Sequence, residues 1–215
     1  MHLKTLAALT ALIASPAFAA TITFPTVSCS SSASGVGTLV TCANGSFVNQ
    51  AHGDVAGQLD VSYLDVDSTN GDSLRWWGTG YNTLPSALWA SGSDANSFAR
   101  ITLTPASGMA ITLDTLDLGA YATNTRTTNL RVFSLGSAVM FSHAGDVGTS
   151  GGPSTFFPSI SSTTGVVIEW ENSAYNVGIN NISYTLAPVP EPRSYALLLG
   201  GLAAVGLLAR RRRAG

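Results

Sequence analysis

The alternation of apolar and polar side chains in the middle of this chain is the feature that most constrains its fold. In LDVSYLDV, Leu59, Val61 and Tyr63 share one face of an extended strand, and mostly polar residues occupy the other. This period of two is typical of a strand in a sheet with one buried face and one wet face. The middle has no long segment with a helical period, so we expect an all-β domain.

Eight segments of the middle have this strand character, and clusters of Gly, Asn, Asp, Ser and Pro separate them. The short connections favour a sandwich or jelly roll over an α/β fold, which needs long crossover helices. We predict a single antiparallel β-sandwich of the jelly-roll kind. The predicted strands are 58–66, 73–78, 98–105, 110–121, 129–135, 138–143, 166–172 and 177–186. The predicted core residues are Val61, Tyr63, Trp76, Ile101, Leu103, Leu113, Leu116, Leu118, Val132, Val167, Ile168, Trp170, Ile179 and Ile182.

The N-terminal residues indicate a leader that lies outside the fold. MHLKTLAALTALIASPAFAA has a short basic start, an apolar run from Leu6 to Ala14, and small residues before the bond after Ala19. The apolar run is too short to span a bilayer, and the small residues suit a signal peptidase. We therefore predict a signal peptide over 1–19, removed by signal peptidase during export through the general secretion machinery.

The charge of the middle argues against one class of partner. The whole chain has a formal net charge of −2, but residues 20–187 hold four arginines, no lysine and eleven carboxylates, a net charge of −7. Nucleic-acid affinity comes mainly from lysine and arginine contacts with phosphates. We therefore expect no nucleic acid as a partner.

Cys29 and Cys42 are the only cysteines of the chain. Disulfides persist in the compartments that exported proteins reach, so we predict a structural bridge between these two residues. Closing a loop of this length would contribute roughly 3 kcal/mol to stability. The alternative, a pair of zinc ligands, lacks a CxxC spacing and a nearby histidine pair.

The segment DVDSTNGD, residues 65–72, has two interpretations. Its three aspartates and one asparagine would suit calcium, but an EF-hand glycine would fall on Asn70 and the closing glutamate is missing. Asn70-Gly71 between two predicted strands indicates a hairpin with a type I′ turn. We expect this turn, and a weak surface calcium site is the alternative.

No residue set in the chain has the arrangement of a known catalytic motif. Glu169 and Glu171 share one face of a predicted strand, about 7 Å apart by backbone rise, a separation that glycosidase carboxylates can have. Every i, i+2 pair has this spacing, and such pairs usually mark a solvated face. His52 and His143 lie in no nucleophile motif, and GTSGG (148–152) is not a GxSxG elbow. We expect no enzyme, catalytic residue, metal or cofactor, with a secreted hydrolase as the third-ranked alternative.

The aromatic cluster WWGTGYNTLPSALW, residues 76–89, supports a binding hypothesis. Flat, rigid tryptophan and tyrosine rings on a sandwich can stack on sugar rings. Adjacent tryptophans on a strand face opposite sides, so at least one of the first two can be exposed. The alternative is that one ring lies in the core and the others pack beneath a loop. The candidate glycan-stacking residues are Trp76, Trp77, Tyr81 and Trp89.

The chain ends on VPEPRSYALLLGGLAAVGLLARRRRAG, which has three parts. Pro190, Glu191 and Pro192 are expected to form an extended, accessible stalk, because the prolines remove donors and fix φ. Residues 195–209 are uncharged and would form a helix of about 22 Å. This is short for a bilayer of about 30 Å, but snorkelling arginines can extend it, so we predict a transmembrane helix. The positive-inside rule places the terminal cluster in the cytoplasm: Arg210, Arg211, Arg212 and Arg213.

This order of motif, apolar helix and arginine cluster closely resembles the PEP-CTERM sorting signal of Gram-negative exported proteins. The resemblance covers Val189 to Arg213 and implies an exosortase as partner, which cuts near the motif formed by Pro190, Glu191 and Pro192. The helix and arginines would then be transient. Arg193 stands where that family more often has a small residue.

The middle resembles the extracellular domains that often precede such tails. HGDVAGQLDVSYLDV, RWWGTGYNTL, ARITLTPASGMAITLDTLDLGAY and NVGINNISY are similar to their successive strands. The resemblance implies a jelly-roll sandwich akin to galactose-binding or carbohydrate-binding modules. Asn180 stands where their final-strand GIDN pattern has an acid, which weakens a structural metal at this position.

These observations divide the chain into a signal peptide (1–19), a β-sandwich extracellular domain (20–187) and a sorting tail (188–215). We expect an exported protein that its C-terminus anchors in the inner membrane before processing, and that then resides on the cell surface or in the extracellular matrix. A structural or adhesive role is the first expectation. The alternative is a carbohydrate-binding module that recognises exopolysaccharide.

Overall fold

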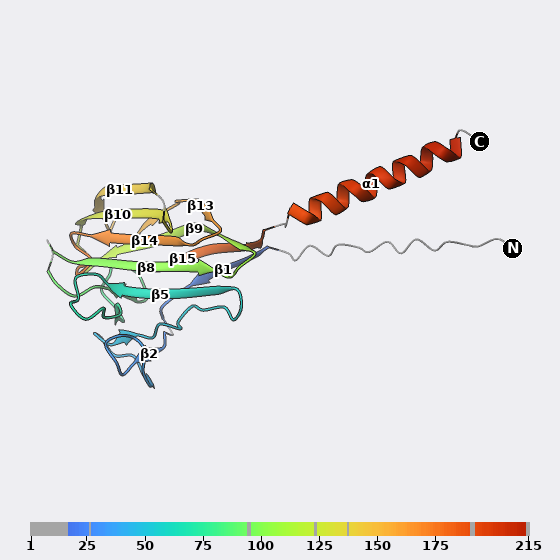
Figure 1. The fold of residues 1–215 in the computed structure, drawn as a ribbon. Helices are drawn as coiled ribbons and strands as arrows, with labels where there is room; N and C mark the ends of the chain where they lie inside the picture. Colours follow the sequence, from blue (N-terminus) through green and yellow to red (C-terminus); the bar gives the residue numbers. More distant parts are fainter. Residues whose placement is uncertain are drawn as a thin grey trace.

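One long strand, β15 (Val177–Pro188), runs from one end of the domain to the other in the computed structural model (Figure 1). It pairs antiparallel with β9 (Met109–Ala120) on one side, and with β1 (Phe18–Ile22) and β7 (Ala87–Trp89) as well. The structure describes residues 17–25, 27–93, 96–122, 124–136, 138–189 and 192–213.

The larger sheet contains ten strands. Their order is β12-β9-β15-β7-β6-β4-β2-β3, with β1 added beside β15 and β13 added beside β9. The strands of this sheet not yet given are β2 (Cys29–Ser30), β3 (Leu39–Val40), β4 (Phe47–Val48), β6 (Arg75–Trp77), β12 (Ser154–Phe156) and β13 (Ile160–Ser162).

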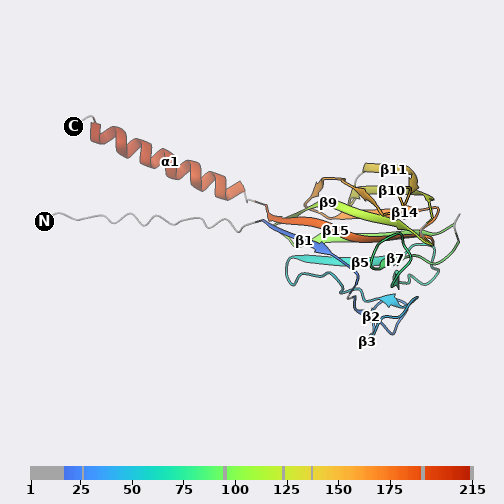
Figure 2. The same cartoon turned by 180° about the vertical axis from the view of Figure 1, so that it is seen from behind.

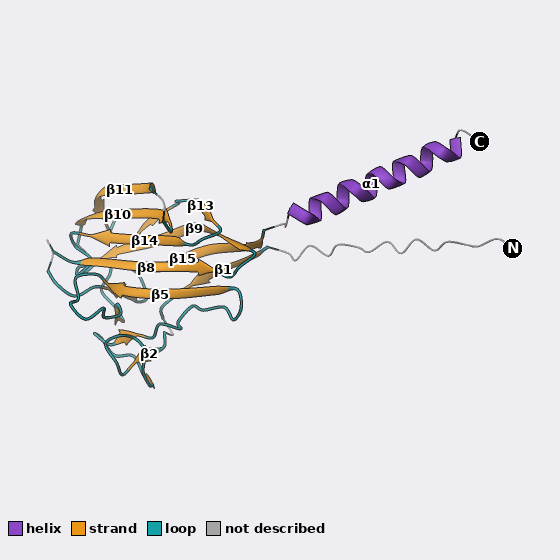
Figure 3. Ribbon diagram, viewed as in Figure 1, coloured by secondary structure: helices purple, strands orange, loops and turns teal. Residues whose placement is uncertain are grey.

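The smaller sheet contains five strands in the order β11-β10-β14-β8-β5. It packs face to face with the larger sheet, and neighbouring strands in both are antiparallel, so the predicted β-sandwich is confirmed (Figure 3). Its strands are β5 (Leu59–Asp65), β8 (Phe98–Pro105), β10 (Arg126–Ser134), β11 (Val139–Val147) and β14 (Val166–Glu171).

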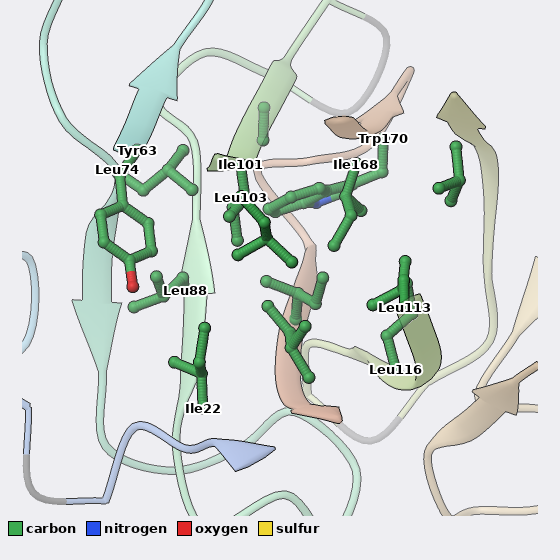
Figure 4. Close-up of a cluster of buried hydrophobic side chains, with 14 of the residues drawn as sticks. Ile22, Tyr63, Leu74, Leu88, Ile101, Leu103, Leu113, Leu116, Ile168 and Trp170 are labelled. Carbon is green, nitrogen blue, oxygen red and sulfur yellow. The ribbon is translucent and has the colours of Figure 1, made fainter. Parts of the chain in front are cut away.

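The hydrophobic core lies between the two sheets (Figure 4). Trp170 of β14 is fully buried, and its indole N–H donates to the carbonyl oxygen of Val177 at 2.8 Å, which ties the smaller sheet to β15. Of the predicted core residues, twelve lie in this core. Trp76 is only partly buried at its edge, and Val167 is buried outside the core cluster. Val167 alternates with Ile168 along β14 and therefore faces the other way.

The eight predicted strands all correspond to observed ones, but the hairpin expected at Asn70-Gly71 was wrong. After β5 the chain crosses from the smaller sheet to the larger one, and β5 pairs with β8. Gly71 has a φ of +68° while Asn70 is not in the left-handed region, so the turn is not type I′. The hydroxyl of Ser68 accepts the backbone N–H groups of Asn70 and Asp72, which stabilises a turn without a hairpin.

The predicted disulfide between Cys29 and Cys42 is present. Cys29 belongs to β2, which pairs with β3 and β4, so the bridge fastens the segment after β3 to the edge of the larger sheet. Gly35 lies in the enclosed loop with a φ of +76°, and a Cβ there would lie 2.6 Å from the carbonyl oxygen of Val48. The loop therefore packs closely on β4.

The C-terminal helix α1 (Pro192–Arg213) extends away from the sandwich at the end where β15 stops (Figures 1 and 2). It is longer than the expected 195–209. The prediction of an extended stalk is wrong for Pro192, which is the first residue of the helix. Proline is well tolerated in the first turn of a helix. Leu199, Leu202 and Val205 are exposed. No helix among the described residues is long and apolar enough to cross a membrane.

Replacing both bridge cysteines, Cys29→Ser with Cys42→Ser, is expected to lower the free energy of unfolding by roughly 3 kcal/mol, because the unfolded chain gains the freedom of the opened loop. In urea titrations, the variant and the parent treated with a reducing agent should have the same free energy of unfolding, because both lack the bridge. Unchanged stability in both would show that the segment 29–42 is not part of the cooperatively folded unit.

Candidate functional site

The strands β6 and β7 divide their side chains between two faces of the larger sheet. Trp76 pairs with Leu88 on the core side, and its indole N–H donates to the carbonyl oxygen of Phe24 at 2.7 Å. Trp77 and Trp89 therefore lie on the outer face, since each is one residue removed from that pair. The prediction is therefore corrected for Trp76, which is a structural residue on the core side. Trp77 and Trp89 remain stacking candidates and lie together on the outer face.

The loop between β6 and β7, residues 78–86, folds over this outer face. It lies close to Gly119 of β9 and Gly178 of β15, which are paired with each other. A Cβ on Gly119 would lie 2.6 Å from the carbonyl oxygen of Tyr81, and one on Gly178 would lie 3.0 Å from ring carbons of Tyr81. Two glycines are therefore required for the loop to approach the sheet.

A second, smaller hydrophobic cluster forms beneath this loop, outside the main core. Tyr81, Leu84 and Ala87 are buried in it, and Trp77, Trp89 and Tyr121 pack against them. Tyr81, itself a residue of this loop, is 3% exposed, so its ring is buried in the cluster. Its hydroxyl donates to the carbonyl oxygen of Tyr175 at 3.1 Å. Burial raises the pKa of the Tyr81 phenol above its usual range.

The partly exposed rings surround a small cavity of about 80 Å³, which we call the aromatic pocket. Trp77 meets Trp89 and Tyr121 edge to face, with ring centroids 6.1 and 5.7 Å apart, and Trp89 meets Tyr175 at 5.3 Å. Such edge-to-face contacts stabilise ring positions. The residues that line the pocket are Trp77, Tyr81, Trp89, Tyr121, Tyr175 and Asn176.

The chemistry of the aromatic pocket suits a small, largely neutral group. Its volume is well below the roughly 300–1,000 Å³ of sites that enclose a whole drug-sized ligand. It can therefore hold a substituent while a larger ligand rests on the rings around it. Tyr175 is 40% exposed, and the other residues that line the pocket are half-buried or buried, so Tyr175 is the most accessible of them. Tyr121 and Tyr175 come from other loops, and neither was among the residues predicted from the cluster at 76–89.

The aromatic pocket and the sorting tail lie at opposite ends of β15. Tyr175 and Asn176 immediately precede β15, while α1 follows its last residue, Pro188. The eleven rises between the twelve residues of β15, at about 3.3 Å each, separate the two features by roughly 36 Å. Figure 2 shows α1 leaving the end of the sandwich at which β15 finishes.

Glu169 and Glu171 form part of an ion-pair ladder on the outer face of the smaller sheet. Glu169 is 5% exposed, and its two oxygens lie 2.6 Å from Arg100 and 3.2 Å from Arg131. Arg131 also contacts Glu171 at 3.1 Å. The prediction that Glu169 lies on a solvated face is therefore wrong, because arginines of the neighbouring strands cover its carboxylate. These contacts explain the buried carboxylate structurally.

Two of the side chains considered for metal binding, Asp65 and Asn180, make structural hydrogen bonds. Asp65 is buried and accepts hydrogen bonds from the backbone N–H and the hydroxyl of Ser91. Asn180 is buried too: its amide N–H donates to the carbonyl oxygen of Ser86 at 2.7 Å, and its oxygen accepts the N–H of Phe24. No group of three or more His, Cys, Asp or Glu side chains in the described part of the chain could hold a metal ion.

The predicted sorting residues fall only partly within the described chain. Pro190 and Glu191 lie outside the described residues. Pro192 is the first residue of α1, and the predicted arginine cluster, 210–213, forms its last turn. Arg210 and Arg211 are exposed.

Tyr81→Phe removes a phenol that stays protonated in the folded protein. A tyrosine in the unfolded chain ionises near pH 10, so only the unfolded state loses this proton as the pH rises. The stability that depends on a raised pKa is therefore complete below about pH 10 and is lost above it. We expect the free energy of unfolding, from urea titrations at several pH values, to fall less steeply above pH 10 in Tyr81→Phe than in the parent. Equal slopes would show that the phenol ionises as readily in the fold.

Comparison with solved structures found matches of low similarity. One is titled "CBM4 structure and function", with 11% identity over 60% of this chain and 86% of that one, and a TM-score of 0.29. The GH26-CBM35 β-(1,4)-mannanase of Podospora anserina and the CBM35 of Cellvibrio japonicus Abf62 each share 14% identity, over 63% and 61% of this chain and 29% and 95% of theirs. Their TM-scores are 0.31 and 0.30. Scores this low support no argument about fold or ligand. Comparison with curated proteins found no match.

Comparison with protein families found one match, at the C-terminus. Residues 188–213 match the PEP-CTERM protein-sorting motif. This segment contains the proline motif, the whole of α1 and the arginine cluster. The motif implies an exported protein that its C-terminus anchors before processing, with an exosortase as the processing partner. The chain therefore carries a PEP-CTERM sorting tail behind an antiparallel β-sandwich.

Proposed function

We propose that this protein is displayed at the cell envelope or in the extracellular matrix and has an adhesive or structural role there. The observation that carries the proposal is the position of the aromatic pocket at the end of β15 opposite the sorting tail. A protein held at one end presents the other end outward. An accessible aromatic surface at that outer end is placed to meet matrix components before and after release from the membrane.

In this proposal the leader and the sorting tail direct the export and processing of the protein. A signal peptidase removes 1–19, the helix 195–209 enters the inner membrane with Arg210 to Arg213 on the cytoplasmic side, and the exosortase cuts near Pro190, Glu191 and Pro192. The exposed side chains of Leu199, Leu202 and Val205 support this, because they have no protein partner in the sandwich. The domain lacks lysine and carries a net charge of −7. An anionic membrane surface would therefore repel it.

Intact mass spectrometry of the protein from its native host tests the route. We expect an N-terminus at Ala20 and a C-terminus near Glu191, because the leader and the helix are both removed. A protein that keeps its residues up to Gly215 would instead be permanently anchored, and the proposed release would be wrong. A variant with Glu191→Ala is the matched test of the motif, and we expect it to accumulate in the unprocessed form.

Glycan binding is the second candidate, and the aromatic pocket favours it. Trp77 and Trp89 on strands of the larger sheet, together with Tyr175 in the turn before β15, form adjoining ring surfaces, and stacking on flat rings is a common way to hold a sugar. Exopolysaccharide is the partner that an envelope protein of this kind would meet. Glycan binding would be the molecular basis of the adhesive role. It therefore also requires that the aromatic pocket faces outward from the membrane.

A polysaccharide pull-down with variants tests the second candidate. Trp77→Ala is expected to weaken retention on exopolysaccharide about tenfold, because it removes a stacking surface and loosens Trp89. The matched control is Phe157→Ala, since Phe157 is an aromatic residue that is 68% exposed and does not line the pocket. Equal binding by both variants would place any glycan site elsewhere, and absence of binding by the parent would remove this candidate.

A further inference from the structure

The rings around the aromatic pocket stand nearly at right angles to one another. The ring planes of Trp77 and Trp89 meet at 80°, and those of Trp77 and Tyr121 meet at 87°. The planes of Trp89 and Tyr175 meet at 85°. Rings in this arrangement cannot all lie flat against one sugar ring. They form the walls of a box instead, and a compact group that enters the box contacts several ring surfaces at once.

The volume of the pocket limits the size of that group. About 80 Å³ gives room for roughly three groups of the size of a water molecule, each of which takes about 30 Å³ in the liquid. A whole sugar ring is several times larger and has to stay outside. An acetyl group, which consists of one methyl and one carbonyl group, has a suitable size.

The charges around the pocket argue against an ionised ligand group. Its lining consists of five aromatic residues and Asn176, none of which is charged at neutral pH. The guanidinium group of Arg75 lies 5.9 Å from the centre of the Trp89 ring. It is already engaged, because it stacks on Phe47 and donates to the carbonyl oxygen of Gly45. A carboxylate would therefore lose its hydration without gaining a partner, and the guanidinium group would repel a cation.

Trp89 has a hydrogen-bond donor that the fold leaves unused. Its indole nitrogen, Nε1, is buried and has no partner among the residues that the structure describes. In contrast, the indole N–H groups of Trp76 and Trp170 each donate to a backbone carbonyl oxygen, at 2.7 and 2.8 Å. The great majority of buried donors in proteins are paired. An unpaired donor on a residue that lines a pocket therefore points to an acceptor atom on the ligand.

We propose that the aromatic pocket recognises the acetyl group of an acetylated polysaccharide. This inference rests on the proposed glycan binding and names the class of glycan. The methyl group packs against the electron-rich faces of the rings, and the carbonyl oxygen accepts the indole N–H of Trp89. Tyr175 is 40% exposed and packs against Trp89, so movement of its ring gives the acetyl group access to this N–H. The sugar ring stays outside the pocket.

Nuclear magnetic resonance of the full-length protein in detergent micelles, labelled with nitrogen-15 at tryptophan, tests the proposal. The chain has 4 tryptophans, so each gives one indole N–H signal, which Trp→Phe variants assign. The probes are short β-(1,4)-linked oligomers of glucose, of O-acetylated glucose and of N-acetylglucosamine. They share one backbone and differ in the presence and linkage of the acetyl group. Tetramethylammonium is the cationic probe.

We expect acetylated oligomers to bind at least about tenfold more tightly than the glucose oligomer, because they add a hydrogen bond and a packed methyl group. They should shift the indole signal of Trp89 and leave those of Trp76 and Trp170 in place. Trp89→Phe keeps an aromatic ring but lacks the donor, so it should lose the preference for acetylated oligomers. The matched control is Trp77→Phe, which should weaken the binding of all oligomers and keep the preference.

Equal binding of acetylated and unacetylated oligomers, or an unchanged preference in Trp89→Phe, would show that the inference is wrong while glycan binding stands. Binding of tetramethylammonium without binding of an acetylated oligomer would also contradict it. If only one of the two acetylated oligomers binds in the expected way, the inference holds and the linkage, amide or ester, is identified. If no oligomer binds, the inference fails together with the proposed glycan binding.

Discussion

The pairing of β15 with β9 is the interaction on which the rest of the structure depends. These are the two longest strands, and they run side by side through the larger sheet. Trp170 fastens the opposite sheet to β15 through the carbonyl oxygen of Val177. Because β15 begins at the aromatic pocket and ends at the sorting tail, the same strand that organises the core also fixes the distance between the two functional ends.

A local irregularity keeps both halves of this strand pair in the core. Ile179 and Ile182 are both fully buried although they are three residues apart, so the alternation changes phase between them. The register shifts there, and Asn181 adopts a φ of +49° while its amide donates to Asp117 at 2.7 Å. An extra residue of this kind is a β-bulge. Without it, the residues after Asn181 would turn their apolar side chains to water.

The site shows how a binding surface can be built outside a core. Two glycines, Gly119 and Gly178, remove the side chains that would hold the loop 78–86 away from the sheet. The loop then buries Tyr81 and leaves Trp77 and Trp89 at the rim of the pocket. Rings supported by a sheet need little ordering when a ligand arrives, which reduces the entropic cost of binding.

The sequence predicted the long strands, the disulfide and most of the core because each depends on local alternation or on compartment chemistry. Short strands such as β2 and β3 were missed, since two residues carry no period. Asn70-Gly71 satisfies a hairpin rule, but the tertiary path carries the chain to the other sheet. The sequence around Trp77 does not indicate that Tyr175 lines the same pocket. Only the pairing of β15 with β7 brings the two residues together.

Hydrogen–deuterium exchange of the folded, full-length protein tests most directly whether β15 and β9 hold the structure together. The account predicts that the amides of these two strands exchange most slowly and at a common rate, since they open only with global unfolding. The short strands at the disulfide edge, β2 to β4, should exchange earlier. If β15 exchanges as fast as the exposed turns, the strand cannot act as the rigid link between the aromatic pocket and the sorting tail, and the account is contradicted.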